Sequence, residues 1–293
     1  MDRKYKVAIL GATGMLGNGV YKVLKDKCDL VLTARSQEKF DQLEKVHGGT
    51  DKHQKIIFDV YNPYVPVELR LNHLVGTIGE VDMVINCVGV LNKFAPGMTP
   101  TTRAYFEINT VLPIWLSRWY GSKLIHPSTD CVFDGKDGQY SESSPYSPSY
   151  GTYGYAKMFA DEVVKEHSLV LRCCLIGEEL DPNAFQMFSW IKRQAQAGGY
   201  IDHIISPITN IEFANVCWRI LTEKIEIPPM ILHLATPPKS KYDILHDYIA
   251  VKKLDVQLSS DGSYHAYKDL VTDYPDILAK LRIVPYHAMM AAL

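Results

Sequence analysis

Several features that would assign this chain to a function class are missing from its sequence. The formal net charge of the 293 residues is only -2, and no basic stripe is present, so we expect no nucleic-acid partner. The longest apolar runs have the length of strands, and we therefore expect no membrane partner. No histidine pair has the spacing of a helical metal site, so we expect no metal.

Cysteine pairs and an export signal are missing as well. The six cysteines form no CxxC pair and lie mostly in apolar stretches, which is typical of buried, reduced thiols. The first residues, 1–6, lead straight into a strand-like run without an apolar export segment. We therefore expect a cytoplasmic protein, because reduced thiols persist in that compartment.

What the sequence does contain is an alternation of short β-branched runs and helical patterns. Apolar residues make up 47% and charged residues 22%, an ordinary globular composition. The runs are almost continuously apolar, which is typical of parallel strands buried on both faces. The expected strands are 5–10, 30–34, 55–58, 83–87, 123–127 and 169–173. These features predict an α/β protein with a Rossmann-like, doubly wound parallel sheet.

The pattern changes near residue 174, and this change predicts a second lobe. We expect residues 1–174 to form a nucleotide-binding domain, to which 210–236 return, and residues 175–209 and 237–293 to form a smaller lobe. Helices are expected at 15–26, 105–120, 153–167, 185–197, 213–224 and 241–251, the last capped by Ser240, and a long ordered loop at 134–149.

The first expected strand runs directly into a glycine-rich turn and a helix. The segment Gly11-Ala-Thr-Gly14-Met-Leu-Gly17 is a GxxGxxG pattern in a strand–turn–helix context. Glycines permit the tight turn and the close approach of a pyrophosphate, and the start of the helix attracts its negative charge. The contacts expected here are Gly11, Thr13, Gly14, Met15 and Leu16. The pattern predicts a dinucleotide cofactor.

The end of the second expected strand favours NADP(H) over NAD(H). An NAD site usually has an acidic residue here that binds the ribose 2′-hydroxyl, but this chain has Arg35 and Ser36. The planar guanidinium of arginine suits a 2′-phosphate. Further cofactor contacts are expected where the next strands end, at Asp59, Val60, Cys87, Val88 and Gly89.

A YxxxK pattern on an expected helix carries the chemistry. Tyr153 and Lys157 are four residues apart and therefore share one helix face, and Thr129 ends an expected strand. An adjacent ammonium group lowers the pKa of a tyrosine from its ordinary value of about 10. The hydroxyl of Thr129 can donate to a reacting carbonyl oxygen. Together the three residues predict the protonation of a ketone while it receives a hydride, or the reverse reaction.

These residues resemble those of the extended short-chain dehydrogenase/reductases, and among them the dTDP-4-dehydrorhamnose reductases. Ser128-Thr-Asp-Cys-Val-Phe-Asp-Gly135 is similar to the STDYVFDG segment of that group, and Tyr140, Glu142, Pro148 and the YxxxK follow in order. The resemblance implies that Tyr153 is the acid/base, that Lys157 binds the nicotinamide ribose and that a nucleotide-sugar 4-ketone is reduced. The substrate contacts that we expect are Thr129, Asp130, Cys131, Tyr153 and Thr209.

Departures from that group leave the substrate open. Cys131 replaces a tyrosine, and the segment 202–209 lacks the glutamine and glycine of the group's DQxGxPT pattern. Asp130 either orients the substrate or caps a turn. Two alternative functions remain: an epimerase or dehydratase that retains NAD, and a non-catalytic NADP-binding regulatory subunit. By analogy with the family, the expected helix with Trp115 and Trp119 suggests a homodimer.

Overall fold

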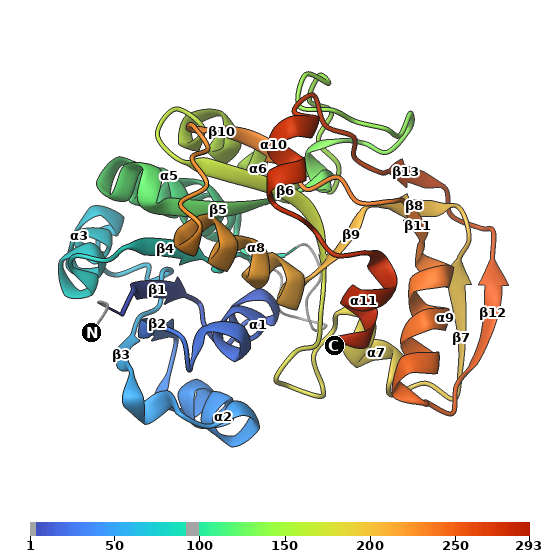
Figure 1. Ribbon diagram of the computed structural model, residues 1–293, viewed down its shortest axis with the longest axis horizontal. Coiled ribbons are helices and arrows are strands. Elements are labelled where there is room, and N and C mark those ends of the chain that lie inside the picture. The colour runs from blue at the N-terminus through green and yellow to red at the C-terminus, as the bar shows by residue number, and fades with distance from the viewer. Residues whose placement is uncertain (1–3, 92–99) are drawn as a thin grey trace.

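The main sheet of the protein is parallel and has the strand order β10-β6-β5-β4-β1-β2-β3 (Figure 1). The computed structural model describes residues 4–91 and 100–293. The strands are β1 (Lys6–Leu10), β2 (Asp29–Ala34), β3 (Gln54–Ile57), β4 (Met83–Asn86), β5 (Leu124–Thr129), β6 (Leu169–Ile176) and β10 (Met230–His233). All six strands expected from the sequence are present, and the Rossmann-like α/β fold is confirmed.

Helices cover both faces of this sheet, which makes it doubly wound. The core on one face is formed with α1 (Met15–Leu24), α2 (Gln37–His47) and α8 (Asn210–Thr222). The core on the other face is formed with α3 (Val67–Ile78), α5 (Leu112–Tyr120) and α6 (Thr152–Val164). Within β1, Val7 and Ile9 pack into the first core, and Ala8 and Leu10 pack into the second. Burial on both faces explains why these strands are apolar throughout.

The helix expected at 105–120 is interrupted by a π-helical turn. It consists of α4 (Thr102–Phe106), a π turn at Glu107–Val111 and α5. Pro113 is the second residue of α5, directly after the π turn, and it has no N–H for the helical ladder. The π turn supports the segment that follows β4, because Asn109 bonds both the N–H and the C=O of Val90. Three short 3-10 turns lie at Thr50–Lys52, Gly121–Lys123 and Asp130–Val132.

Two small sheets and two helices form the second lobe. The strands are β7 (Gln196–Tyr200), β8 (His203–Ile205), β11 (Lys239–Ser240), β12 (Gln257–Asp261) and β13 (Ala266–Lys268), and the helices are α7 (Met187–Ile191) and α9 (Lys241–Lys252). The helix expected at 241–251 is confirmed as α9, and its capping box is completed by Ser240 and Asp243. In Figure 1 the lobe, with α9, β7 and β12, lies on the right of the molecule, and the main-sheet strands β1 to β3 lie on the left.

The helix expected at 185–197 is wrong, because α7 ends at Ile191 and residues 196–200 form β7. Gly199 explains the difference: a Cβ at this position would lie 2.9 Å from the Cα of Tyr242, so the glycine lets β7 pack closely against α9. Gly199 therefore marks a close backbone approach in a strand, and not the C-cap of a helix.

The C-terminal segment joins the two cores. After β9 (Pro207–Thr209), which pairs with the end of β6, the chain returns to the main sheet as α8 and β10. The last helices are α10 (Pro275–Lys280) and α11 (Tyr286–Ala291). Met289 packs in a main-sheet core and Met290 packs in the core of the lobe, so the predicted lobe segment 237–293 contributes to both. Among the described residues, no helix is long and apolar enough to span a membrane.

Candidate active site

A cavity of about 1280 Å³ lies where the carboxyl ends of the main-sheet strands face the lobe. Its wall on the main-sheet side includes Gly11 and Arg35, and its wall on the lobe side includes Trp190, Tyr200 and Lys241. In open α/β sheets, ligands bind at the carboxyl ends of the strands. The cavity therefore has the location of a ligand site.

The glycine loop forms one end of this cavity and is shaped by backbone contacts. Gly11 has a φ of +73°, and a Cβ on it would lie 3.0 Å from the Cγ2 of Val88. A Cβ on Gly17 would lie only 2.1 Å from the carbonyl oxygen of Gly11. Gly14 is exposed, and no described side chain caps α1 at this residue. The first N–H groups of α1 are therefore open to an anion in the cavity.

Most of the predicted cofactor contacts line the cavity. They are Gly11, Thr13, Gly14, Met15, Arg35, Asp59, Val60, Cys87, Val88 and Gly89. Leu16 does not, because its side chain is buried in the main-sheet core. Ser36 does not either: its hydroxyl caps α2 by accepting from the N–H of Lys39 at 3.4 Å. A motif gives the position of a residue but not the direction of its side chain, and contact of the cofactor with the backbone N–H of Leu16 stays a prediction.

A second basic residue, missed by the sequence argument, lies near Arg35. Lys39 lines the same cavity, and its Nζ donates to the Oε1 of Gln42 at 3.0 Å. Arg35 is exposed and forms no hydrogen bond or ion pair with the described residues. Lys39 is the third residue of α2, the helix that follows β2. This position is the signal that could have identified it as a cavity residue. The two cations give this end of the cavity a positive charge.

The predicted catalytic hydroxyls are close together at the end of β5. Thr129 is the last residue of β5, and Tyr153 is the second residue of α6. The Oγ1 of Thr129 donates to the Oδ1 of Asp130 and accepts from the N–H of Cys131, both at 3.1 Å, and Thr129 also lowers the pKa of the nearby Tyr153. Asp130 therefore orders the threonine hydroxyl and is the first residue of a 3-10 turn that Thr129 caps, while its role in orienting the substrate stays a prediction.

Lys157 faces the sheet. Its Nζ donates to the carbonyl oxygen of Pro127 at 2.9 Å and lies 3.2 Å from the Nε2 of His126. Within the described part of the chain, neither contact involves Tyr153. Burial raises the pKa of Tyr153 well above its ordinary value, and Thr129 offsets only part of this shift. The expectation that Lys157 lowers the pKa of Tyr153 is therefore wrong for this state of the protein, because burial dominates.

Among the predicted catalytic and substrate-binding residues, Asp130, Tyr153 and Lys157 are buried, whereas Thr129 and Cys131 are partly exposed. As far as the chain is described, neither the three catalytic residues nor Asp130 and Cys131 line the cavity. Burial raises the pKa of the Cys131 thiol to about 12, so this residue is a neutral thiol.

The prediction for Thr209 is wrong on packing grounds. Its side chain is fully buried, and its hydroxyl caps α8 by accepting from the N–H of Glu212. When a polar residue directly before a helix is inaccessible to solvent, its side chain caps that helix and is not available to a ligand. We therefore remove Thr209 from the substrate contacts.

A buried ionic network, also missed from the sequence, supports the end of β5. The hydroxyl of Ser128 donates to the Oδ2 of Asp161 at 2.7 Å, and the Nη2 of Arg172 donates to the same oxygen at 2.9 Å. The Nη1 of Arg172 lies 2.9 Å from the Nε2 of His233. Asp161 is fully buried, and Arg172 is 1% exposed. Such a network fixes the position of the strand end beside Thr129.

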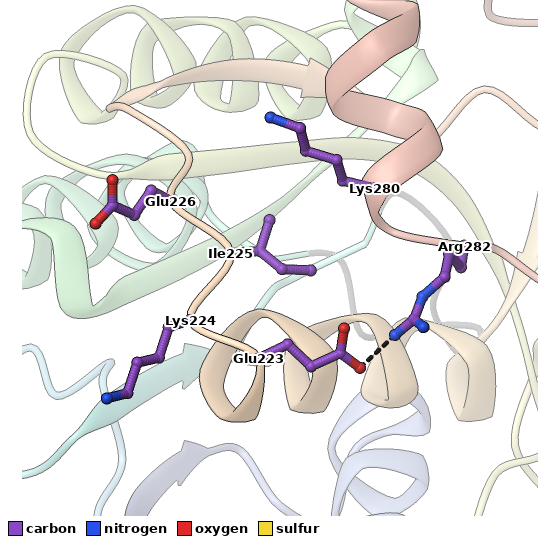
Figure 2. Close-up of a pocket in the computed structure, with 6 residues that line it drawn as sticks. All are labelled: Glu223, Lys224, Ile225, Glu226, Lys280 and Arg282. Atoms are coloured by element: carbon purple, nitrogen blue, oxygen red, sulfur yellow. Dashed lines mark hydrogen bonds and ion pairs between the residues drawn. The ribbon is translucent and has the colours of Figure 1, made fainter.

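A shallower hollow of about 600 Å³ lies between α10 and the segment after α8 (Figure 2). It is lined by Glu223, Lys224, Ile225, Glu226, Lys280 and Arg282. Its charges are of both signs, and Arg282 forms an ion pair with Glu223. It shares no described residue with the cavity at the glycine loop, and its charges do not indicate one class of ligand.

The strand order, the glycine loop and the lobe over the strand ends define an extended short-chain dehydrogenase/reductase fold. Within that class, the chain belongs to the RmlD substrate binding domain family, whose model matches residues 81–257.

Curated relatives and solved structures are similar to the chain at low identity. Methionine adenosyltransferase 2 subunit beta from Xenopus laevis is 26% identical over an alignment of 258 residues. The match covers 82% of this chain and 70% of that protein. The subunit from Bos taurus is 28% identical over 243 residues; the match covers 77% of this chain and 64% of that protein, less than two thirds of its length.

Two solved structures show the shared fold over nearly the whole chain. dTDP-4-dehydrorhamnose reductase from Bacillus anthracis in complex with NADP has a TM-score of 0.72 at 16% identity, covering 99% of this chain and 98% of that one. UDP-glucose-4-epimerase from Stenotrophomonas maltophila with bound NAD has a TM-score of 0.73 at 13% identity, covering 98% and 95%. At these identities the similarity concerns the fold alone.

Proposed function

We propose that the protein is an NADPH-dependent reductase of the 4-keto group of a nucleotide-linked sugar. The observation that carries the proposal is the placement of Thr129 at the end of β5 and of Tyr153 at the start of α6, at the strand edge where the glycine loop opens a large cavity. Membership of the RmlD substrate binding domain family supports the same reaction class.

The main-sheet side of the cavity fits a dinucleotide. Any side chain on Gly17 would collide with the carbonyl of Gly11, and the uncapped start of α1 can bind a pyrophosphate. Arg35 and Lys39 can hold a 2′-phosphate, which supports NADP(H) over NAD(H). The bound reduced nicotinamide supplies a hydride to the substrate.

The side chains near β5 supply the proton and bind the carbonyl oxygen. In this proposal Tyr153 gives its phenolic proton to the substrate oxygen, and Thr129 donates a hydrogen bond to the same oxygen. The buried tyrosine is neutral and thus in the state needed for proton donation, because burial raises its pKa. Since Tyr153 is only 7% exposed and does not line the cavity, the proposal requires a rearrangement around its hydroxyl when the substrate binds.

An epimerase or dehydratase that retains NAD is the alternative within the same fold. The similarity to UDP-glucose-4-epimerase supports it. Such an enzyme would purify with tightly bound NAD and would not consume external NADPH. Cys131 after Asp130 argues against a dehydratase, because dehydratases of this fold resemble each other in an acidic pair at these positions.

A second candidate is a non-catalytic regulatory subunit that binds NADP(H). Two observations favour it: the curated relatives are named as a subunit, and Lys157 bonds β5 while Tyr153 stays buried. Cofactor binding without turnover on any ketosugar would support this candidate.

We also propose a cytoplasmic homodimer. The described free cysteines support a reducing compartment. Trp119 on α5 and Phe159 on α6 are 58% and 49% exposed, which supports an apolar contact between two copies.

The reductase proposal is tested by incubating the purified protein with NADPH and 4-ketosugars linked to dTDP, UDP, GDP or CDP. We expect one of them to be reduced with stoichiometric loss of NADPH, and NMR of the product gives the stereochemistry of the new hydroxyl. Retention of NAD without loss of NADPH would contradict the reductase and support the epimerase.

A further inference from the structure

The amine of Lys157 has a neighbour that the proposed reaction does not use. The Nε2 of His126 lies 3.2 Å from the Nζ of Lys157, and the Nδ1 of the same ring lies 3.3 Å from the Nδ2 of Asn86. Asn86 and His126 are each 1% exposed, and Lys157 is 7% exposed. Because these three side chains are buried, their polar atoms must find their hydrogen-bond partners within the protein.

The orientation of the Asn86 amide determines where the imidazole proton lies. The Oδ1 of Asn86 accepts from the N–H of Val88 at 3.3 Å, so its Nδ2 is the end that donates to His126. Burial lowers the pKa of His126 well below its ordinary value, so the ring is neutral. A neutral imidazole has one proton and one acceptor nitrogen. Because Nδ1 accepts from Asn86, the proton lies on Nε2 and points at Lys157.

In this arrangement the nitrogen of Lys157 can only accept the hydrogen bond from His126. An Nε2–H group can bond the lysine nitrogen only through a lone pair, which an ammonium does not have. A neutral amine has a lone pair for His126 and keeps hydrogens for the carbonyl of Pro127, in agreement with both distances. Burial also lowers the pKa of Lys157, in the same direction.

We propose that His126 is a positioning residue that holds Lys157 as a neutral amine in the ligand-free protein, and that Asn86 links this amine to the cavity loop Cys87–Gly89. The inference rests on the proposed function together with the family resemblance, which implies that Lys157 binds the nicotinamide ribose, and we assign the ammonium form to the lysine in that complex. Binding of the cofactor must then bring one proton from the solvent to the lysine nitrogen. The bond to the Nε2–H of His126 breaks in that step.

The groups that act on this pair come from three segments. Asp161 lies on the same helix as Lys157 and favours the ammonium, and Arg172 on β6 opposes it. Cys173 on β6 and Cys131 after β5 also raise the pKa of Lys157, and Lys157 in turn lowers the pKa of His126. Asn86 on β4 does not titrate. Proton uptake on cofactor binding can therefore be assigned to Lys157 if the uptake is absent in a variant that lacks this lysine.

Calorimetric titration of the full-length protein with NADPH at pH 8, in two buffers of different ionisation enthalpy, tests the proposal. We expect the wild type to take up about one proton per NADPH. Lys157→Met should take up none. His126→Gln should also take up almost none, because the amide oxygen of glutamine accepts from an ammonium and Lys157 is then charged before binding. His233→Gln, a control at another buried histidine, should take up as many protons as the wild type.

Wild-type binding of NADPH without proton uptake, or equal uptake in His126→Gln, would overturn the inference and leave the reductase proposal standing. Absence of NADPH binding in the wild type would overturn the reductase proposal. The lysine is then assessed in the ligand-free protein from the 15Nζ resonance that is lost in Lys157→Met. A neutral amine at pH 8 in the wild type that becomes an ammonium in His126→Gln supports the role of His126, and an ammonium in both contradicts it.

Discussion

The two ends of the candidate site differ in how their functional groups are held. The cofactor end is open: Gly14 is exposed, and Arg35 has no partner among the described residues. The catalytic end is closed: Tyr153 is 7% exposed, the hydroxyl of Thr129 bonds Asp130, and Lys157 bonds β5. Backbone N–H groups and surface cations are ready for a ligand, whereas buried hydroxyls and amines keep internal partners until a ligand replaces them. The difference predicts that cofactor binding and chemistry can be separated by mutation.

The largest expected effect comes from breaking the cofactor end at Gly17. Gly17→Ala puts a Cβ 2.1 Å from a backbone oxygen, and we expect a loss of at least about 3 kcal/mol of stability or an insoluble protein. Gly14→Ala is the matched control, because its Cβ would lie 3.5 Å from the same oxygen. Urea denaturation of both variants measures the effect. A Gly17→Ala protein as stable as Gly14→Ala would show that the loop does not pack as described.

Acid should destabilise the closed end. Burial, with Arg172 nearby, lowers the pKa of His233 to about 4, whereas the unfolded residue has a pKa of about 6.5. Between these values the unfolded chain binds a proton that the folded protein does not, so stability falls as the pH falls from about 6.5 to 4. The shift corresponds to about 3 kcal/mol. In His233→Gln, urea midpoints should fall less over this range. An unchanged pH slope would contradict the burial of a neutral imidazole.

A smaller effect is expected at the phosphate end of the cofactor. Arg35→Ala should weaken NADPH binding roughly 10- to 100-fold, because a hydrogen bond between charged groups contributes about 1.5–3 kcal/mol. NADH lacks the 2′-phosphate, and its dissociation constant should stay the same. Lys45→Ala on α2 serves as the control, because Lys45 is exposed and outside the cavity lining. Equal losses for both cofactors would remove Arg35 from the 2′-phosphate site.

The parts of the site that the sequence predicted are those made by neighbouring residues. A glycine loop needs its glycines at fixed spacing whatever the rest of the chain does, and Tyr153 and Lys157 share a helix face because they are four residues apart. The strands were predictable because burial on both faces requires a continuous apolar run. The capping box at Ser240 was predictable for the same local reason.

The remaining features depend on contacts between distant segments. The bond between Lys157 and His126 joins residues 31 positions apart, and no pattern around either residue indicates it. Burial reverses the shift expected for the pKa of Tyr153. Gly199 lies just after the region that was expected to be helical, although it accommodates Tyr242 of another element. The lobe wall of the cavity, with Trp190 and Tyr200, has no motif of its own, because its residues meet only in the folded protein.

Tyr153→Phe, measured for both cofactor binding and turnover, tests the central claim most directly. Removing one oxygen from a residue that lies outside the cavity lining should leave the dissociation constant of NADPH within about twofold, while kcat for the ketosugar falls roughly 100- to 10,000-fold, the usual contribution of a general acid. Thermal unfolding of the variant checks that the fold is retained. A variant that binds NADPH normally and turns over at the wild-type rate would contradict the account, because the proton would then come from another group.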